Sequence, residues 1–276
     1  MKHTIDYKSI LNTTYLGIRR SAVFMALGLN ASRDPRLTDY SLSKDTAYQF
    51  LPPNLPEEKV SEFKNEFGKW VVTNGFRELI EAFAIFLDRL HEATLLVNQI
   101  GRPFDPKTSK IIRKFDHEGI DKKLSILESL GVRCGFSEHA ATLWHARNCL
   151  THRRGIVAHE DLNADGHLSI KWKAIEMFAQ GDSGMETILV ETPGEPFVTT
   201  EPSKLCLRYP DRKLSFALKE VVCLQPKQLA EICTFVFFTT HELFAGACAV
   251  ATAKGINATR IELTFNRAKT DKTGSK

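Results

Sequence analysis

The residues of this chain that could do chemistry gather in one short run, from Trp144 to Gly155. The run contains an arginine and an asparagine, Arg147 and Asn148, followed by His152. Phosphoryl chemistry uses a cation that holds a phosphoryl oxygen, and the planar, permanently charged guanidinium of arginine suits that role. It also uses a group that exchanges a proton near neutral pH, as histidine does. The run therefore predicts a site for phosphate chemistry.

The spacing limits how these side chains can meet. In an α-helix, which turns by about 100° per residue, Arg147 and His152 lie roughly 140° apart, whereas Asn148 and His152 share a face. Two arrangements bring Arg147 and His152 to one phosphate. Either the helix ends between them, or two copies of the chain each supply part of the site. Gly155 favours a helix end nearby, because glycine commonly follows the last helical residue.

A purely structural role accounts for several of the same residues. Cations in the last turn of a helix stabilise it through the helix dipole, so Arg153 and Arg154 can serve as capping residues alone. A single arginine and a single histidine near a helix end are more often structural than catalytic. Spacing by itself therefore leaves both interpretations open.

The pattern Arg147-Asn148-x-x-x-His152, late in a helix of an otherwise helical chain, resembles the R-x4-6-H signature of the HEPN superfamily. The family prefers a polar residue after the arginine, and Asn148 matches. The resemblance covers residues 58–154 and 225–255. It implies a bundle of about four or five helices, usually dimeric, in which the motifs of two protomers face each other. Many members are metal-independent endoribonucleases of toxin–antitoxin, antiviral or RNA-processing systems.

The resemblance also implies roles for the residues. His152 would act as general acid or base on the RNA 2′-OH or the leaving oxygen, and Arg147 would neutralise the developing phosphate charge. Asn148 would orient His152 or contact the phosphate. The product would be a 2′,3′-cyclic phosphate, formed without metal or cofactor. We include His145, which is nearly eclipsed with His152, and Thr151 and Arg153 as supporting residues.

An acidic residue on a neighbouring helix could orient Arg147 or His152. Glu81 and Asp88 lie seven residues apart on one face of a predicted helix, and we name them as the acids. The alternative is that both belong to a solvated face.

A second interpretation belongs to another functional class. The chain would be a non-catalytic HEPN-like module that binds a partner protein or nucleic acid. The large insertion and the lack of a second convincing catalytic group favour it. The partners that we expect are RNA as substrate, a second copy of the chain, and an antitoxin or nucleotidyltransferase.

Composition is that of a soluble globular protein: 276 residues, 43% apolar, 25% charged, with a net charge of +4. Six cysteines form no C-x-x-C pair and no signal peptide is recognisable, so we expect a cytoplasmic protein with reduced thiols. The most apolar window, residues 229–253, carries Glu231, His241 and Glu242, which favours a buried core helix over a membrane span.

Other common sites are not indicated. The chain has no P-loop, no dinucleotide-binding glycine motif, no nucleophile elbow and no H-E-x-x-H helix. His139, His145, His152 and His159 recur at six or seven residues, whereas metal-binding pairs on a helix usually lie three or four apart. We therefore predict no metal site.

The predicted fold is mainly α, an HEPN-like helical bundle with an inserted small antiparallel β-sheet. Periodicity predicts helices over residues 7–29, 57–98 and 121–130, and a break in the second of these near Asn74-Gly75. It also predicts a helix from about 137 to 154, with Ser137 as its capping residue, and a last helix that begins at Pro226. Residues 101–116 are expected to form a basic loop, which would follow an RNA backbone only if it lies beside the motif. Strands are predicted at 168–173, 187–190 and 214–222.

These elements divide the chain into four parts. We expect an N-terminal helix and packed connector at 1–56, the bundle at 57–155 and 225–265, a β-rich insertion at 156–224, and a disordered tail at 266–276.

Overall fold

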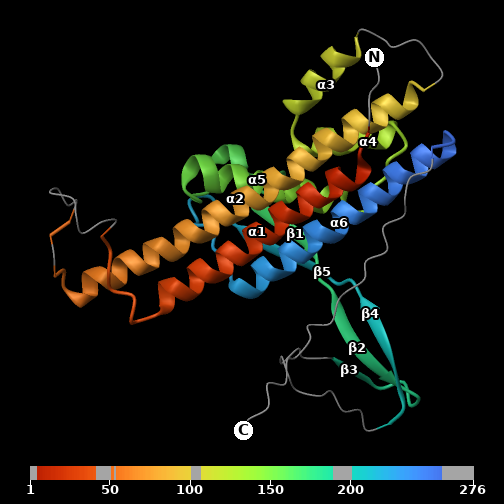
Figure 1. The fold of residues 1–276 in the computed structure, drawn as a ribbon. Helices are drawn as coiled ribbons and strands as arrows, with labels where there is room; N and C mark the ends of the chain where they lie inside the picture. Colours follow the sequence, from red (N-terminus) through yellow and green to blue (C-terminus); the bar gives the residue numbers. More distant parts are fainter. Residues whose placement is uncertain (1–4, 42–50, 53, 101–106, 189–200, 257–276) are drawn as a thin grey trace, which may run out of the picture.

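In the computed structural model of the protein, residues 5–41, 51–52, 54–100, 107–188 and 201–256 are described. The predicted connector and C-terminal tail lie partly or wholly outside these residues. Figure 1 shows long helices packed side by side, with β2, β3 and β4 grouped below them. The predicted fold class is confirmed at this level: the chain is mainly helical and carries small antiparallel sheets.

The bundle is built on three long helices, α1 (Tyr7–Arg33), α2 (Glu57–Asn98) and α6 (Pro226–Ala253). α1 runs antiparallel to α2, and glycines let the two approach closely. A Cβ atom on Gly17 would lie 2.6 Å from the Cβ of Ala82, and one on Gly75 would lie 2.1 Å from Cγ of Met25. The predicted break at Asn74-Gly75 is therefore wrong, because Gly75 serves helix packing and α2 is continuous.

α1 is also longer than predicted. Asp6 caps its start by accepting a hydrogen bond from the Ser9 backbone N–H at 2.9 Å. Its end lies at Arg33 and not at residue 29, because Gly28 does not terminate the helix. Instead, Gly28 packs on Val71, whose Cγ2 would lie 2.7 Å from an added Cβ.

Three shorter helices cover the bundle: α3 (Thr108–Asp116), α4 (Ile120–Ser129) and α5 (Ser137–Arg153). The predicted basic loop over 101–116 is wrong for residues 108–116, which form α3. Phe115 anchors α3 by stacking on His91 of α2 with ring centroids 3.7 Å apart. Ser137 does not cap α5 as predicted. Phe136 occupies that position, and the Ser137 hydroxyl donates to the Cys134 carbonyl.

The predicted single sheet is in fact two. β1 (Leu168–Lys173) pairs antiparallel with β5 (Asp211–Phe216), and its Ile170 and Trp172 are buried in the main core. β2 (Glu176–Gly181) pairs with β3 (Glu186–Ile188) and β4 (Ser203–Arg208) in a three-stranded sheet. The predicted strand at 214–222 is wrong beyond Phe216, because residues 217–222 turn back towards the bundle.

α6 has the length and hydropathy of a membrane-spanning helix, but half of its most apolar window is buried inside the protein. Leu229, Phe235 and Leu243 are among its buried residues. The expectation that this segment forms a core helix is thus consistent with its packing.

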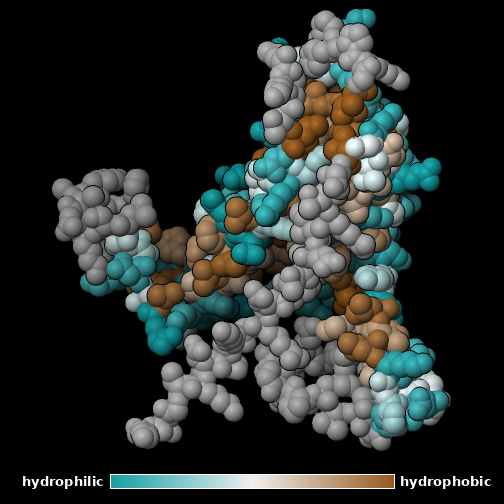
Figure 2. All heavy atoms as spheres, turned by 45° about the vertical axis from the view of Figure 1, so that its right-hand side comes forward, coloured by the Kyte–Doolittle hydropathy of each residue, from teal (hydrophilic) through white to brown (hydrophobic). Residues whose placement is uncertain are grey.

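α1 and α2 extend beyond the start of α6, at the left of Figure 1. We call this part the arm and define it as residues 29–33 of α1 and 57–69 of α2. Figure 2 shows brown, apolar side chains at its surface between hydrophilic ones. Phe63 and Phe67 of the arm are among these exposed apolar residues.

Candidate functional site

The motif residues lie in the last two turns of α5, which runs without interruption to Arg153. The helix therefore does not end between Arg147 and His152, which excludes the first of the two predicted arrangements. It ends where Gly155 predicted: Arg154 has the left-handed φ of 54°, and the Gly155 N–H donates to the Cys149 carbonyl at 3.1 Å. Arg147 and His152 consequently point to different sides of one helix.

Arg147 is fixed in a partly buried position between α5 and α2. Its Nη2 donates to Oε1 of Glu81 at 2.7 Å, and its Nη1 donates to Oδ1 of Asn148 at 3.1 Å. Its guanidinium carbon lies 5.0 Å from the centroid of the Trp144 ring. Only 16% of the side chain is exposed, and the buried Nε has no hydrogen-bond partner among the residues that the structure describes. This arrangement holds a charged fork in one orientation.

His152 and His145 lie on the opposite, solvent-facing side of α5, and Asn148 borders them. Together with Ala141 they form a ridge with the spacing 141, 145, 148 and 152, which follows one helical face. Asn148 links this ridge to the Arg147 fork through its side-chain oxygen. Thr151 lies beside the ridge, and its buried hydroxyl has no hydrogen-bond partner.

Arg153 has a structural contact that its assignment as a supporting residue did not predict. Its Nε donates to Oδ2 of Asp161 at 2.7 Å, and its Nη2 also contacts the same carboxylate. Only 2% of the Asp161 side chain is exposed. Asp161 lies in the short 3-10 helix η1 (His159–Asp161), so this pair ties the chain after α5 back to the helix. The Arg153 guanidinium is therefore already bonded to the Asp161 carboxylate and holds the chain after α5 in place.

The two acids named from the sequence behave differently. Glu81 does contact Arg147 and lies 3.8 Å from Arg77 as well. Asp88 does not reach the motif, because its carboxylate pairs with Lys123 of α4. Burial raises the pKa of the Asp88 carboxyl, and the Lys123 ammonium opposes that rise. Asp88 thus belongs to the α2–α4 contact.

The basic residues of α3 lie away from the His152 end of the motif. α3 packs on the end of α2 near His91, whereas the end of α5 lies near Val72. These two points lie nineteen positions apart on α2, or about 28 Å along the helix axis. The Trp144 end of the motif is nearer to α3, because a Cβ atom on Gly119, just after α3, would lie 3.4 Å from Nε1 of Trp144. The described part of 101–116 therefore does not form an RNA track beside His152.

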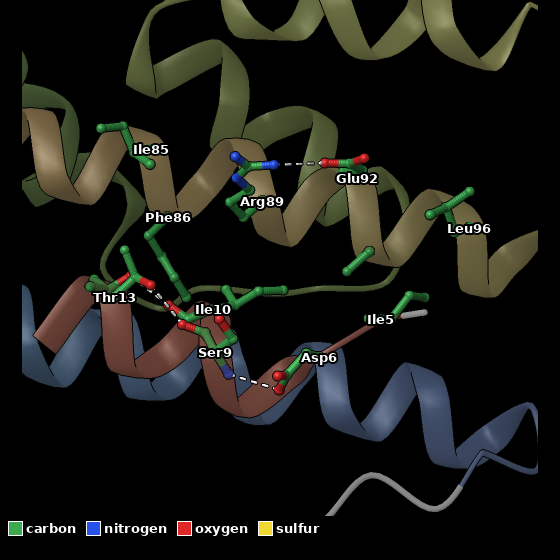
Figure 3. Close-up of a pocket in the computed structure, with 12 residues that line it drawn as sticks. Ile5, Asp6, Ser9, Ile10, Thr13, Ile85, Phe86, Arg89, Glu92 and Leu96 are labelled. Carbon is green, nitrogen blue, oxygen red and sulfur yellow. Dashed lines mark hydrogen bonds and ion pairs between the residues drawn. The ribbon is translucent and has the colours of Figure 1, made fainter. Parts of the chain in front are cut away.

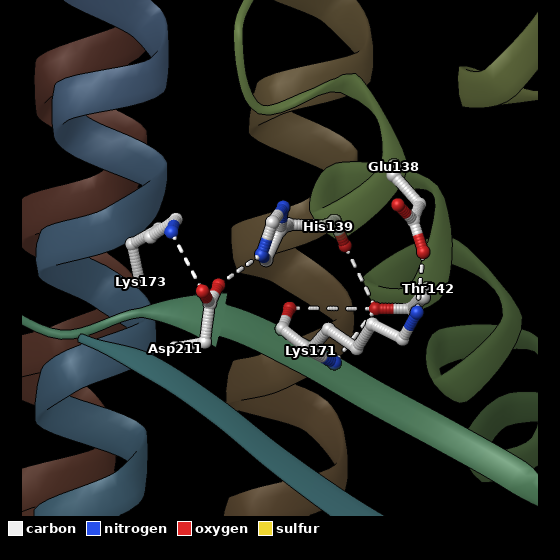
Figure 4. A network of polar contacts seen from close by, with 6 residues as sticks. All are labelled: Glu138, His139, Thr142, Lys171, Lys173 and Asp211. Atoms are coloured by element: carbon white, nitrogen blue, oxygen red, sulfur yellow. Dashed lines mark hydrogen bonds and ion pairs between the residues drawn. The ribbon is translucent and has the colours of Figure 1, made fainter. Parts of the chain in front are cut away.

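Polar residues missed by the sequence analysis join the start of α5 to β1 and β5 (Figure 4). His139 Nε2 and Lys173 Nζ each lie 2.8 Å from a carboxylate oxygen of Asp211. Hydrogen bonds from Lys173 and His139 lower the pKa of the Asp211 carboxyl. The Thr142 hydroxyl accepts a hydrogen bond from the Lys171 N–H at 2.8 Å. These contacts position α5 on the sheet, and only the fold brings them together.

A hollow between α1 and the second half of α2 is the next place where a ligand could bind (Figure 3). Its volume is about 390 Å³. Arg89 lies 3.5 Å from Glu92, and Asp6 is engaged in capping α1. Its charged groups thus have partners in the protein. Within the described ranges, no three metal-binding side chains come together.

Comparisons with models of protein families, with curated proteins and with solved structures found no match. The motif residues and their geometry are therefore what indicates a function for this chain.

Proposed function

We propose that the protein is a metal-independent endoribonuclease of HEPN type, acting as a homodimer in the cytoplasm as a toxin or antiviral RNase. The observation that carries the proposal is the pairing of an oriented Arg147 fork with an exposed His152 on the same continuous helix. A single copy keeps these groups apart. Two copies joined along α5 would bring the His152 of one towards the Asn148 of the other, to which the Arg147 fork is bonded.

The ridge of α5 is suited to form such a dimer interface. In a two-fold dimer each residue of the interface meets the same surface of the other copy. Ala141 is small and allows close approach, while His145, Asn148 and His152 carry polar groups that would line the seam. A dimer formed in this way would contain two sites, each with the His152 of one copy and the Arg147 of the other.

The reaction follows from the groups present. His152 takes the proton of the RNA 2′-OH, and the oxygen attacks the adjacent phosphorus. The P–O5′ bond breaks, and the leaving oxygen receives a proton from a water molecule, whose hydroxide takes up the proton that His152 removed. The products are a 2′,3′-cyclic phosphate and a 5′-OH. Arg147 neutralises the charge that develops on the phosphoryl oxygens, an effect often worth about 3 kcal/mol.

Arg147 must exchange a bond with Glu81 for one with phosphate. The Glu81 side chain is 45% exposed, so water can solvate the released carboxylate. Pairs with one exposed partner contribute little to stability, typically about 1 kcal/mol or less. Glu81 therefore serves to hold Arg147 in place before RNA binds.

The first experiment is cleavage of single-stranded RNA by the purified protein with EDTA present. We expect the parent to cut and His152→Ala to leave the RNA intact. His117→Ala is the matched control, because His117 is an exposed histidine outside the motif helix, at the C-terminal cap of α3. If all three proteins leave RNA intact, or if His152→Ala cuts as well as the parent, the proposal fails.

One observation favours the second interpretation, a non-catalytic interaction module. β4 is the last strand of its sheet among the described residues, and Leu205 and Leu207 on it are 68% and 53% exposed. Edge strands of this kind can pair with another chain. An antitoxin or nucleotidyltransferase bound there would remain bound to His152→Ala, whereas no form of the protein would cut RNA.

A further inference from the structure

A second hollow lies where the arm meets the end of the motif helix. α1, α2, the end of α5 and residues 221–226 form its walls, and its volume is about 440 Å³. We call it the cationic cleft, because its charged lining residues are Arg33, Lys64, Lys69 and Arg154. Among the residues that the structure describes, no aspartate or glutamate lines it. An anion in this cleft would therefore meet attraction without direct repulsion.

The cations of the cleft are only weakly neutralised by the protein. Lys64 Nζ donates to the Asp34 backbone carbonyl at 2.6 Å and lies near the Asp34 carboxylate, which is itself bonded to Arg36. Lys69 pairs with Glu66 at 2.9 Å, but both side chains are about 70% exposed, and such pairs are weak. Arg33 and Arg154 make no ion pair with any residue that the structure describes. The cleft thus carries excess positive charge.

This charge is particular to the cleft. The hollow of Figure 3 lies between the same two helices, yet there Arg89 is accompanied by Asp6 and Glu92. The cationic cleft also continues into an adjoining hollow of about 530 Å³ that shares Arg33 and Lys64. Together they follow α2 from Thr73 to Glu57, or about 24 Å of helix, and Glu57 at the outer end is an acidic residue that lines the adjoining hollow. An elongated groove of this kind is better matched to a chain of phosphates than to a single ion.

We propose that the cationic cleft binds the phosphate backbone of single-stranded RNA and guides the strand to the end of α5. Arg154 lies two residues after His152, so a strand leaving the cleft passes the end of the helix that carries the proposed catalytic residue. The choice of RNA among polyanions rests on the proposed function. Ser32, Asn65 and Thr73 in the cleft can add hydrogen bonds to phosphate. Binding should therefore be salt-dependent and tolerant of sequence.

The test measures binding without cleavage. A labelled 2′-O-methyl oligonucleotide has no 2′-OH to attack, so its fluorescence anisotropy reports binding alone. The test variant is the full chain with Arg33→Gln, Lys69→Gln and Arg154→Gln, all at exposed positions. The matched control removes the same charge at the far end of the bundle, with Lys110→Gln, Arg113→Gln and Lys122→Gln.

We expect the cleft variant to bind about tenfold or more weakly, with the slope of log K against log salt reduced by about 2, since each phosphate contact on a single strand contributes roughly 0.7. The control variant should stay within about twofold of the parent. The proposal that RNA binds in the cleft is contradicted if both variants bind equally weakly, if neither binds more weakly than the parent, or if the parent does not bind the oligonucleotide. It is also contradicted if the parent binds anionic vesicles more tightly than the oligonucleotide. If the triple variant does not fold, Arg154→Gln alone is measured, with an expected slope change of about 0.7.

The same proteins, given unmodified RNA, separate the two proposals. A parent that binds the analogue through the cleft but cuts no RNA supports the cleft and refutes the nuclease. A parent that cuts RNA while both triple variants bind and cut alike refutes the cleft and keeps the nuclease.

Discussion

At the scale of single residues, Arg147 is distinguished by the fixed orientation of its guanidinium between Glu81, Asn148 and the Trp144 ring. Lysine would keep the charge but could not reproduce this fork. We expect Arg147→Lys to reduce the rate of RNA cleavage by about 100-fold, as the loss of one oriented donor to a transition state commonly does. The unfolding free energy should change by only about 1 kcal/mol, because Glu81 is half exposed.

Arg77→Lys is the matched control for this change. Arg77 also faces Glu81, but at 3.8 Å and from a half-exposed position on α2. Single-turnover cleavage by this variant should equal that of the parent. Equal losses in both variants would show that any guanidinium contact with Glu81 matters and that the orientation of Arg147 has no special role.

Arg153 should behave as a structural residue. Arg153→Ala would leave the Asp161 carboxylate buried without its guanidinium partner, and breaking a buried pair in this way costs about 3 kcal/mol or more. We expect urea unfolding to show a loss of that size, with cleavage per folded molecule unchanged. In the double variant Arg153→Met, Asp161→Leu, most of the stability should return, since no buried charge remains unpaired. A cleavage defect in a stably folded Arg153 variant would instead show that Arg153 takes part in the catalytic site.

At the scale of elements, His91 makes the α2–α3 contact sensitive to pH. Burial lowers its pKa from 6.5 to about 4. Both ring nitrogens lack hydrogen-bond partners, and the ring stacks on Phe115. The folded protein therefore binds this proton less readily than the unfolded chain does. The stability present above about pH 6.5 is lost as the pH falls towards 4, by up to roughly 3 kcal/mol.

The measurement is the unfolding free energy of parent and His91→Phe between pH 7 and pH 4. The difference between the two removes the effects of other groups that titrate in this range, such as Asp88. We expect the variant to be relatively more stable at pH 4 than at pH 7. A difference that is constant with pH would mean that His91 is not buried in its neutral form.

The helices that the sequence predicted well are those with long apolar stripes. α2 and α6 carry such stripes, so their positions followed from periodicity alone. α3 was missed because its two buried residues, Thr108 and Phe115, are embedded in a run of basic residues. Its packing depends on His91, which lies far away in the sequence. A pattern within one segment does not contain that information.

The same limit applies to the candidate site. The contact of Arg147 with Glu81 was anticipated, since both lie in strongly periodic helices. The choice between Glu81 and Asp88 needed the position of Lys123. The cationic cleft was not predicted at all, because Arg33, Lys64 and Arg154 come from three separate helices. The charge run in 101–116, which the sequence did display, lies elsewhere in the fold.

At the scale of the whole molecule, the proposed site needs two copies of the chain. Mixing Arg147→Ala with His152→Ala tests this directly, because each protein is inactive alone. A mixed dimer with sites composed in trans contains one intact pair, from the Arg147 of one protomer and the His152 of its partner. Random exchange makes half of the dimers mixed, so about a quarter of the parent activity should return.

The control is a mixture of Arg147→Ala with the double variant that carries both changes, which contains no intact pair. Activity that stays absent in the first mixture, although native mass spectrometry shows mixed dimers, would place both groups within one protomer or refute the site.

The β-rich segment leaves the bundle and returns to it at one place. The Val222 N–H donates to the Gly155 carbonyl at 2.8 Å, and the Val157 N–H donates to the Glu220 carbonyl at 2.9 Å. Farther out, the Ala174 N–H donates to the Pro210 carbonyl at 3.0 Å, and β2, β3 and β4 all lie beyond that point. A tight hairpin turn could join Ala174 to Pro210 directly. Related chains can therefore gain, lose or replace the three-stranded sheet during evolution while the helices and their motif keep their places.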